Sequence, residues 1–418
     1  MHVFTQLFLF ALSLGLLIQI WLLWRHKQHV SKHQHQVPPA FADSVSLDEH
    51  QKAASYTLTR VKAAGFELIL GTLLLLAWTL GGGLNWLHQI WDSTTLSSLP
   101  AGVAFILSAF LIMGLLDIPI SVWRTFSLET RFGFNHTTPR RFIIDLLTQT
   151  GLMLLIGTPL LWVILWIMES IGSLWWLAAW AVWIAFTLLM TWAYPTFIAP
   201  LFNKFEPLED TELKDRIQQL LTRCGFSSNG IFVMDGSQRS SHGNAYFTGL
   251  GKSKRIVFFD TLLESLSADE MEAVLAHELG HFKRKHVLKR MVTMSLVSLI
   301  GLALLGWLSQ QPWFFSALGM QQTSDAAALL LFLMVIPVFS QFLQPFSSWL
   351  MRKQEFEADD YATEQANPAA MIQALVKLYR ENASTLTPDP LYSAYHDSHP
   401  PAPIRVSHIA ASINSTST

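Results

Sequence analysis

The stretch AVLAHELGHFKRKH, residues 273–286, places two histidines four residues apart and a glutamate directly after the first. On a helix, His277 and His281 stand one turn apart on the same face, so both imidazole rings can bind a single metal ion. Glu278 lies beside them, within reach of a water on that ion. The pattern favours a catalytic zinc site over an ordinary polar helix face.

Sequence features on the amino-terminal side of this stretch mark where the helix begins. Ser267 and Glu270 form an S-x-x-E capping box ahead of it. Further upstream, GIFVMDG at 230–236 predicts a short strand, and NAYFTGLGKSKRIVFFD at 244–260 predicts two strands around a Gly-Leu-Gly turn. These elements lie in one long hydrophilic insertion, about 194–290, which we expect to form a small α+β unit.

The composition of the whole chain is that of a membrane protein. Of its 418 residues, 51% are hydrophobic and only 14% are charged, against about 25% charged in soluble domains. The net charge of −2 gives no reason to expect binding to nucleic acid. Cys224 is the single cysteine, so an internal disulfide and a cysteine-rich metal site are both excluded. Any metal must therefore be held by histidines and carboxylates.

Seven apolar runs are long enough to cross a bilayer, for which about 20 residues are needed. They are Val3 to Trp24, Ala63 to Trp86, Leu99 to Trp123, Leu146 to Met168, Leu174 to Ala193, Met291 to Leu308 and Ala326 to Leu350. We therefore predict an all-α membrane protein of seven transmembrane helices that carries the small α+β unit. Residues 1–193 would form an amino-terminal region of five helices. Residues 194–418 would contain the HELGH helix, two further transmembrane helices and a cytoplasmic tail.

The positions of lysine and arginine give the orientation of these seven spans. Segments 1–2, 87–98, 169–173 and 309–325 contain neither residue, so all 28 basic residues fall on the other side of the membrane. The positive-inside rule makes that side cytoplasmic. We expect the amino terminus outside, the carboxyl terminus in the cytoplasm and the HELGH helix at the cytoplasmic membrane surface.

A catalytic zinc ion needs a third protein ligand and an open fourth position for water. The best candidate lies just after the seventh run, in RKQEFEADDYA at 352–362, where Glu355 and Asp359 share one helical face. Glu355 can bind the metal while Asp359 supports a ligand histidine through its other ring nitrogen. Glu357 points roughly 200° away from Glu355 at 100° per residue, so it is the weaker choice. We expect one zinc ion per chain.

Several blocks of sequence resemble, in order, the zinc-dependent CAAX prenyl protease family of integral-membrane metallopeptidases, of which this would be a bacterial member. The blocks are HQKAASYTLTR, ETRFGFNHTTPRRFIIDLL, FIAPLFNKFEPL, HGNAYFTGLGKSKRIVFFDTLL, HELGH, EFEADDYA and SHPPAPIR. The resemblance implies seven tilted helices that enclose a large chamber, with the zinc site at its cytoplasmic end. The bacterial inner membrane is the expected location, or the endoplasmic reticulum if the host is eukaryotic.

The resemblance also implies roles for individual residues around the metal. His277, His281 and Glu355 would bind zinc and Glu278 would be the general base, in agreement with the reasoning from the residues alone. Asp359 matches a carboxylate near the ligands that acts either as a proton donor or as support for a ligand.

On the substrate side, the resemblance points to residues before and after the HELGH helix. His399 and Arg405 match positions that bind the substrate backbone or stabilise the oxyanion, and His399 would be the second electrophile beside zinc. Asn244, Ala245 and Tyr246 lie in an edge strand that would bind the substrate as an added strand, which fixes its backbone without demanding a particular sequence.

Three functions agree with this sequence. The first is an endopeptidase that cuts near the carboxyl terminus of prenylated CAAX proteins, and the second is a broader protease that clears misfolded membrane proteins. The third is a membrane transporter or scaffold with a structural zinc, for which the intramembrane Asp117 is the only support. A structural zinc site would be closed by a fourth protein ligand, so a protease is favoured. Its partners would be a peptide or protein substrate and the lipid bilayer.

Overall fold

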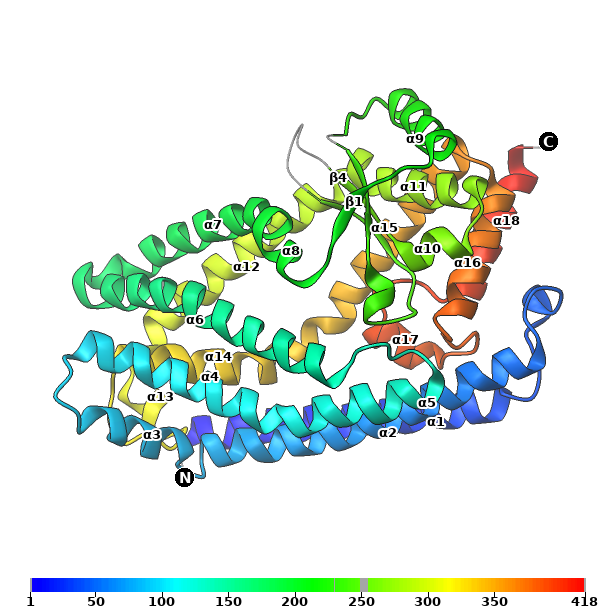
Figure 1. Ribbon diagram of the computed structural model, residues 1–418. Coiled ribbons are helices and arrows are strands. Elements are labelled where there is room, and N and C mark those ends of the chain that lie inside the picture. The colour runs from blue at the N-terminus through cyan, green and yellow to red at the C-terminus, as the bar shows by residue number, and fades with distance from the viewer. Residues whose placement is uncertain (1, 229, 249–254, 417–418) are drawn as a thin grey trace.

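The computed structural model describes residues 2–228, 230–248 and 255–416. Within them, seven helices are long and apolar enough to cross a membrane, as predicted. These spans are Val3–His33 (α1), Leu47–Trp78 (α2), Ser98–Phe132 (α4, η2 and α5), Pro139–Ser170 (α6), Gly172–Phe202 (η3, α7, η4 and α8), His286–Leu308 (α12) and Asp325–Gln365 (α14, η6 and α15). Figure 1 shows α1 and α2 lying along one side of the molecule, α7 and α12 along the opposite side, and α6 running between them.

The second span differs from its predicted limits at both ends. We expected 63–86, but α2 begins at Leu47 behind a capping box of Ser46 and Glu49, and it ends at Trp78. A run of glycines stops it, because Gly82 takes a left-handed conformation with φ of 79° that suits a residue without a Cβ. The chain continues as a separate helix, α3 (Gly83–Asp92).

The seventh span is longer than predicted. It was expected to end at Leu350, but α14 (Asp325–Ser340), the short turn η6 (Gln341–Leu343) and α15 (Gln344–Gln365) follow one another without an intervening loop. The residues after Leu350 are polar enough to leave the membrane, yet none of them breaks a helix. Figure 1 shows that the helix changes direction between α14 and α15. This span of 41 residues therefore carries Glu355 on a helical segment that continues directly from the membrane helix α14.

The hydrophilic insertion contains a four-stranded sheet in the order β1-β2-β4-β3. The three predicted strands are confirmed as β2 (Ile231–Met234), β3 (Ala245–Thr248) and β4 (Arg255–Phe259), while the predicted Gly-Leu-Gly turn lies outside the described residues. A short strand that was not predicted, β1 (Phe205–Pro207), adds to one edge. β2 and β4 are parallel, whereas β3 is antiparallel to β4 and forms the other edge.

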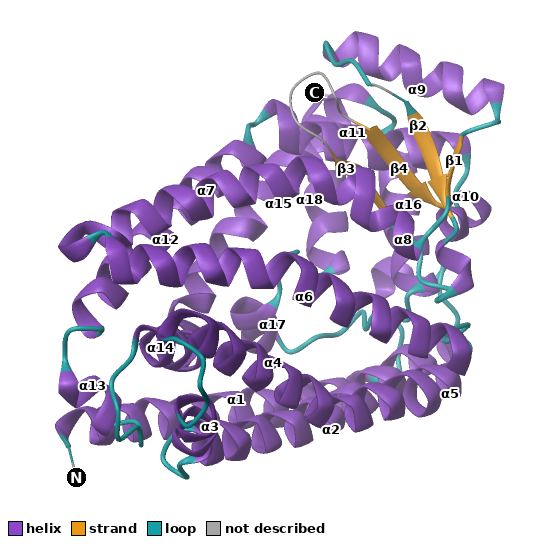
Figure 2. Ribbon diagram, turned by 60° about the vertical axis from the view of Figure 1, so that its left-hand side comes forward, coloured by secondary structure: helices purple, strands orange, loops and turns teal. Residues whose placement is uncertain are grey.

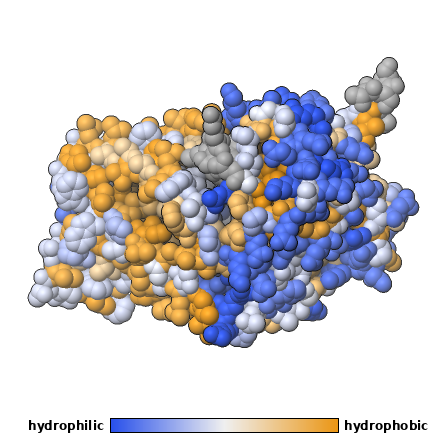
Figure 3. Space-filling model, turned by 45° about the horizontal axis from the view of Figure 1, so that its top comes forward, coloured by the Kyte–Doolittle hydropathy of each residue, from blue (hydrophilic) through white to orange (hydrophobic). Residues whose placement is uncertain are grey.

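The two largest hydrophobic clusters among the described residues lie in the membrane part and in the hydrophilic part. The membrane core is built from α1, α4, α6, α7, α12 and α14 and includes Phe8, Phe105 and Leu330. In the second core, Phe258 of β4 and Leu279 of the HELGH helix are fully buried. Figure 2 places the strands at one end of the molecule, and Figure 3 shows hydrophobic surface over the membrane helices and hydrophilic surface at that end.

Candidate metal centre and substrate cavity

The HELGH helix is α11 (Ala268–Lys283), and its predicted capping box is present. The Ser267 amide donates to Glu270 at 2.7 Å, and the Glu270 amide donates back to the Ser267 hydroxyl at 3.4 Å. Further along, α11 packs against α15 at Gly280. A Cβ at that position would lie 3.0 Å from the Cα of Ala358, closer than side chains normally pack. The glycine within HELGH thus lets the two helices that carry the candidate ligands approach each other.

Three predicted ligand side chains meet at this helix contact. His277 Nε2 lies 3.3 Å from His281 Nε2, and the carboxylate of Glu355 lies 3.5 Å from the first and 3.3 Å from the second. Two ligands placed about 2.0–2.1 Å from a tetrahedral zinc ion stand ~3.3 Å apart. The three side chains therefore have the spacing of ligands that share one zinc ion, and they form the one such group of histidines, cysteines and carboxylates among the described residues.

The Glu355 carboxylate supplies a second reason to place a cation here. Its Oε2 atom is fully buried and makes no well-directed hydrogen bond within the described structure, although His399 Nδ1 lies 2.6 Å away and the Arg405 guanidinium 3.8 Å away. A buried carboxylate oxygen without such a bond is costly unless a cation binds it. The donor set of two imidazoles and one carboxylate is that of a catalytic zinc site. The residues present fit zinc.

His277 is held from behind by a buried carboxylate and a buried guanidinium. Its Nδ1 atom lies 2.9 Å from Asp359, which the structure buries completely. Arg405 donates to both oxygens of Asp359, at 2.9 and 2.5 Å. Burial alone would lower the pKa of His277, but Asp359 and Glu355 outweigh it and raise that pKa to about 9. Arg405 is only 7% exposed and also lies 3.8 Å from the Glu355 carboxylate, so it contacts the acidic residues of the metal centre, and its expected contact with substrate stays a prediction.

The other ligand histidine has a neighbour that the sequence analysis did not identify. His286, the last residue of the stretch 273–286, places its Nδ1 atom 2.9 Å from Nδ1 of His281, and its Nε2 atom lies 3.0 Å from Glu357. The histidine was visible in the sequence, but its position depends on the turn between α11 and α12. Glu357 lies away from the metal ligands, as predicted.

Glu278 follows His277 on α11 and is partly exposed. Within the described residues it forms no ion pair, so its carboxylate is not committed to a partner. β3 packs against the same helix through Phe247 and Phe282, whose ring centroids are 5.4 Å apart. The predicted substrate strand thus lies beside the metal centre, and Ala245 and Tyr246 form part of the edge strand.

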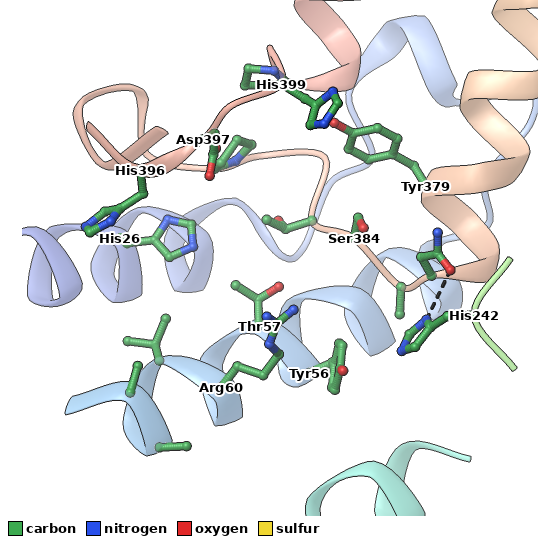
Figure 4. A pocket seen from close by; sticks show the side chains of 18 of the residues that line it. His26, Tyr56, Thr57, Arg60, His242, Tyr379, Ser384, His396, Asp397 and His399 are labelled. Atoms are coloured by element: carbon green, nitrogen blue, oxygen red, sulfur yellow. Dashed lines mark hydrogen bonds between the residues drawn. The ribbon is translucent and has the colours of Figure 1, made fainter. Parts of the chain in front are cut away.

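A cavity of about 960 Å³ opens beside the metal centre. Its lining comes from α1, α2, η2 (Arg124–Glu129), the segment before β3, α16 (Pro368–Glu381) and the chain from 382 to 401. Asn244 and His399 both line it, and Figure 4 shows the imidazole of His399 beside the phenol of Tyr379. Tyr379 and Asp397 were not predicted: Tyr379 lies outside the quoted sequence blocks, and Asp397 directly precedes the block SHPPAPIR without belonging to it.

Comparisons with known proteins agree with this geometry. Residues 207–413 match the model of peptidase family M48, and residues 26–204 match that of the CAAX prenyl protease amino-terminal region with five membrane helices. The chain is 33% identical to CAAX prenyl protease 1 of Saccharomyces cerevisiae, covering 91% of this chain and 89% of the relative. The chain belongs to peptidase family M48.

Two further relatives extend the likeness. A homologue of CAAX prenyl protease 1 from Arabidopsis thaliana is 39% identical over 68% of each chain. The crystal structure of Ste24p from S. mikatae superposes with a TM-score of 0.91 at 31% identity, covering 98% of this chain and 99% of that one. This M48 peptidase is therefore a multi-pass membrane zinc metalloprotease, and the transporter or scaffold hypothesis is set aside.

Proposed function

We propose that this M48 peptidase cuts peptide bonds near the carboxyl terminus of CAAX-type, prenylated proteins. The observation that carries the proposal is the cavity of about 960 Å³, which is lined by residues of the membrane helices α1 and α2 and by His399. His399 Nδ1 lies 2.6 Å from the carboxylate of the candidate ligand Glu355. A chain end could enter such a space while an attached lipid stays near the apolar helices. The relatives named CAAX prenyl protease 1 align in sequence with this chain over 89% and 68% of their own length.

In this proposal, His277, His281 and Glu355 hold one zinc ion. When bound there, zinc supplies Lewis acidity that acidifies water and polarises the substrate carbonyl. Glu278 takes the proton from the attacking water and passes it to the leaving amine. His399 donates a hydrogen bond to the carbonyl oxygen as negative charge develops on it. Its side chain is 63% exposed and adjoins Glu355, so a substrate can reach it.

The edge strand β3 would hold the substrate backbone. Within the described sheet, β3 pairs only with β4, so its outer edge can add an extended peptide. Asn244 stands directly before this strand and lines the cavity, with its side chain accepting a hydrogen bond from the Ala245 amide at 2.8 Å. Asp359 and Arg405 act indirectly in this scheme, because they orient His277 from behind.

The catalytic side of the protein is assigned to the cytoplasm on the distribution of its 28 basic residues. A bacterial inner membrane would then carry the amino terminus outside, and the endoplasmic reticulum is the alternative for a eukaryotic host. A reporter fused after Trp91 should be external and one fused after Pro139 cytoplasmic. If both reporters were found on the same side of the membrane, this orientation would be wrong.

A substrate trap tests both the mechanism and the substrate class. Glu278→Gln should keep zinc, because the three ligands remain, but lose nearly all peptidase activity. Substrates captured in cells by this variant and identified by mass spectrometry should carry prenylated carboxyl-terminal tails. Capture of misfolded membrane proteins alone would favour the quality-control function, and wild-type activity in the zinc-loaded variant would refute the role of Glu278.

The contribution of the lipid can be measured separately in detergent. Two synthetic peptides of identical sequence, one farnesylated on its CAAX cysteine and one not, should be cleaved with kcat/KM at least tenfold higher for the farnesylated form. Equal values for the two peptides would remove prenylation from the proposal while leaving the peptidase mechanism intact.

A further inference from the structure

His286 occupies a position that the peptidase mechanism has not used. It is the first residue of α12 and is 1% exposed, directly beside the metal centre. The chain reaches it through Lys285, whose φ of 58° and ψ of 31° are left-handed. This conformation is unfavourable for a residue with a Cβ, and it is rare outside glycine and asparagine. The turn between α11 and α12 therefore accepts backbone strain and brings His286 back against His281.

The hydrogen bonds around His286 allow one consistent assignment of protons. Because Nε2 of His281 faces His277 and Glu355, its Nδ1 atom must carry the proton when Nε2 binds a metal. Nδ1 of His286, 2.9 Å away, must then accept that hydrogen bond. A neutral His286 consequently carries its proton on Nε2, where it donates to the Glu357 carboxylate at 3.0 Å.

We propose that His286 is a positioning residue that fixes the ring orientation of His281 and increases its strength as a zinc ligand, and that Glu357 fixes His286 in turn. The inference rests on the proposed function in one respect, namely that His281 binds zinc. The two ligand histidines then receive matching but chemically different support. His277 is backed by the charged pair of Asp359 and Arg405, and His281 by a neutral imidazole that leads to a carboxylate near the surface.

A buried histidine can also be an ordinary core residue, and the two roles predict different effects. Loss of a core contact lowers thermal stability in proportion to lost packing and leaves the ligand geometry unchanged once zinc is bound. Loss of a hydrogen bond to a ligand lowers metal affinity or activity by about 10 to 100-fold. It also changes the electronic environment of the bound metal, which the absorption spectrum reports.

The experiment uses the full-length protein in detergent and measures zinc affinity by competition with a chromophoric chelator. His286→Leu should bind zinc about 10 to 100-fold more weakly. His286→Asn should stay within about threefold of wild type, because its amide oxygen can accept from His281 at the position of the lost Nδ1. The visible absorption of cobalt-substituted protein should shift in His286→Leu and not in His286→Asn.

A second histidine–carboxylate pair, whose histidine is 36% exposed, provides a control for the loss of such a contact. His408 belongs to α18 (Ala402–Thr416), and its Nε2 atom lies 2.6 Å from Asp360 of α15, the helix that also carries Glu357. Among the described contacts, His408 has none with a candidate ligand. His408→Leu removes the same chemistry and should leave zinc affinity and the cobalt spectrum unchanged. If His286→Leu fails to fold, Glu357→Gln replaces it. The Glu357 side chain is 35% exposed, so its replacement should not disturb folding. Glu357→Gln should bind zinc several-fold more weakly, and its melting temperature in saturating zinc should equal that of the wild type.

The inference would be overturned if His286→Leu had the zinc affinity and the cobalt spectrum of the wild type. The same holds for Glu357→Gln if His286→Leu does not fold. His281→Ala separates this failure from failure of the proposed function. If His281→Ala loses zinc while the His286 variants do not differ from wild type, only the positioning role is wrong. If His281→Ala retains full zinc affinity, the proposed ligand set is wrong.

Discussion

The metal face and the cavity face of the site are built in different ways. The side chains of His277, His281 and Glu355 are 7%, 16% and 7% exposed, and they come from two helices in close contact. On the cavity face, the His399 side chain is 63% exposed and lies in a segment between two helices, and Asn244 lies in the exposed segment directly before β3. Helix packing thus fixes the geometry of the metal, whereas exposed segments leave room for different substrates. Variants should accordingly separate metal binding from substrate turnover.

The largest effect should come from the metal face. Glu355→Ala leaves only two ligand histidines, so it should lower the zinc content of purified protein by a large factor and abolish activity. Metal analysis and a peptide cleavage assay measure both losses. Glu357→Ala should still bind one zinc per chain when zinc is saturating. Full zinc content in Glu355→Ala together with loss of metal in Glu357→Ala would show that the wrong face of α15 has been assigned.

On the cavity face, His399→Ala should lower kcat by about 10²–10³-fold, the usual cost of removing one donor to an oxyanion. Zinc content should stay at the wild-type level, because the three ligands are untouched. Steady-state kinetics and metal analysis on the same preparation test both statements. Loss of zinc in this variant would mean that His399 belongs to the metal face.

The support behind His277 should give a smaller effect. Asp359→Ala removes the acceptor 2.9 Å from His277 Nδ1 and should cost about 10 to 100-fold in zinc affinity or activity. Asp359→Asn should cost less, since an amide oxygen can still accept that hydrogen bond. Chelator competition distinguishes the two variants. Equal losses in both would point to the negative charge of Asp359, and not its hydrogen bond, as the important property.

Zinc binding should also depend on pH. The pKa of His277 lies at about 9, above its ordinary value of 6.5, and zinc binds only an imidazole that has lost this proton. The apparent zinc affinity should therefore rise about tenfold per pH unit toward pH 9 and then level off. In protein stripped of zinc, His277 contributes stability that is complete below pH 6.5 and is lost as pH rises through about 9. Chelator competition and thermal melting across this range measure both trends, and a flat affinity profile would contradict the assignment.

Patterns with a fixed repeat were predictable from the sequence. The seven spans follow from runs of apolar residues, and the meeting of His277 with His281 follows from the helical repeat alone. The contact of α15 with α11 could be expected from the ligand count of zinc, but its closeness depends on Gly280 packing on Ala358. His286 could not be assigned, because its position depends on a left-handed backbone at Lys285 that lysine rarely adopts. The hydrogen bonds from Arg405 to Asp359 could not be predicted either, since sequence order does not show which side chains a later segment contacts.

The long seventh span has a consequence for how the protein is made. The candidate ligands on α11 emerge from the ribosome first, and Glu355 follows only after α12 and most of the Asp325–Gln365 helix have been synthesised. A nascent chain therefore holds two of the three proposed ligands until its last membrane helix is complete. Because two histidines alone do not form a catalytic zinc site, the unfinished protease would be inactive while it passes through the insertion machinery.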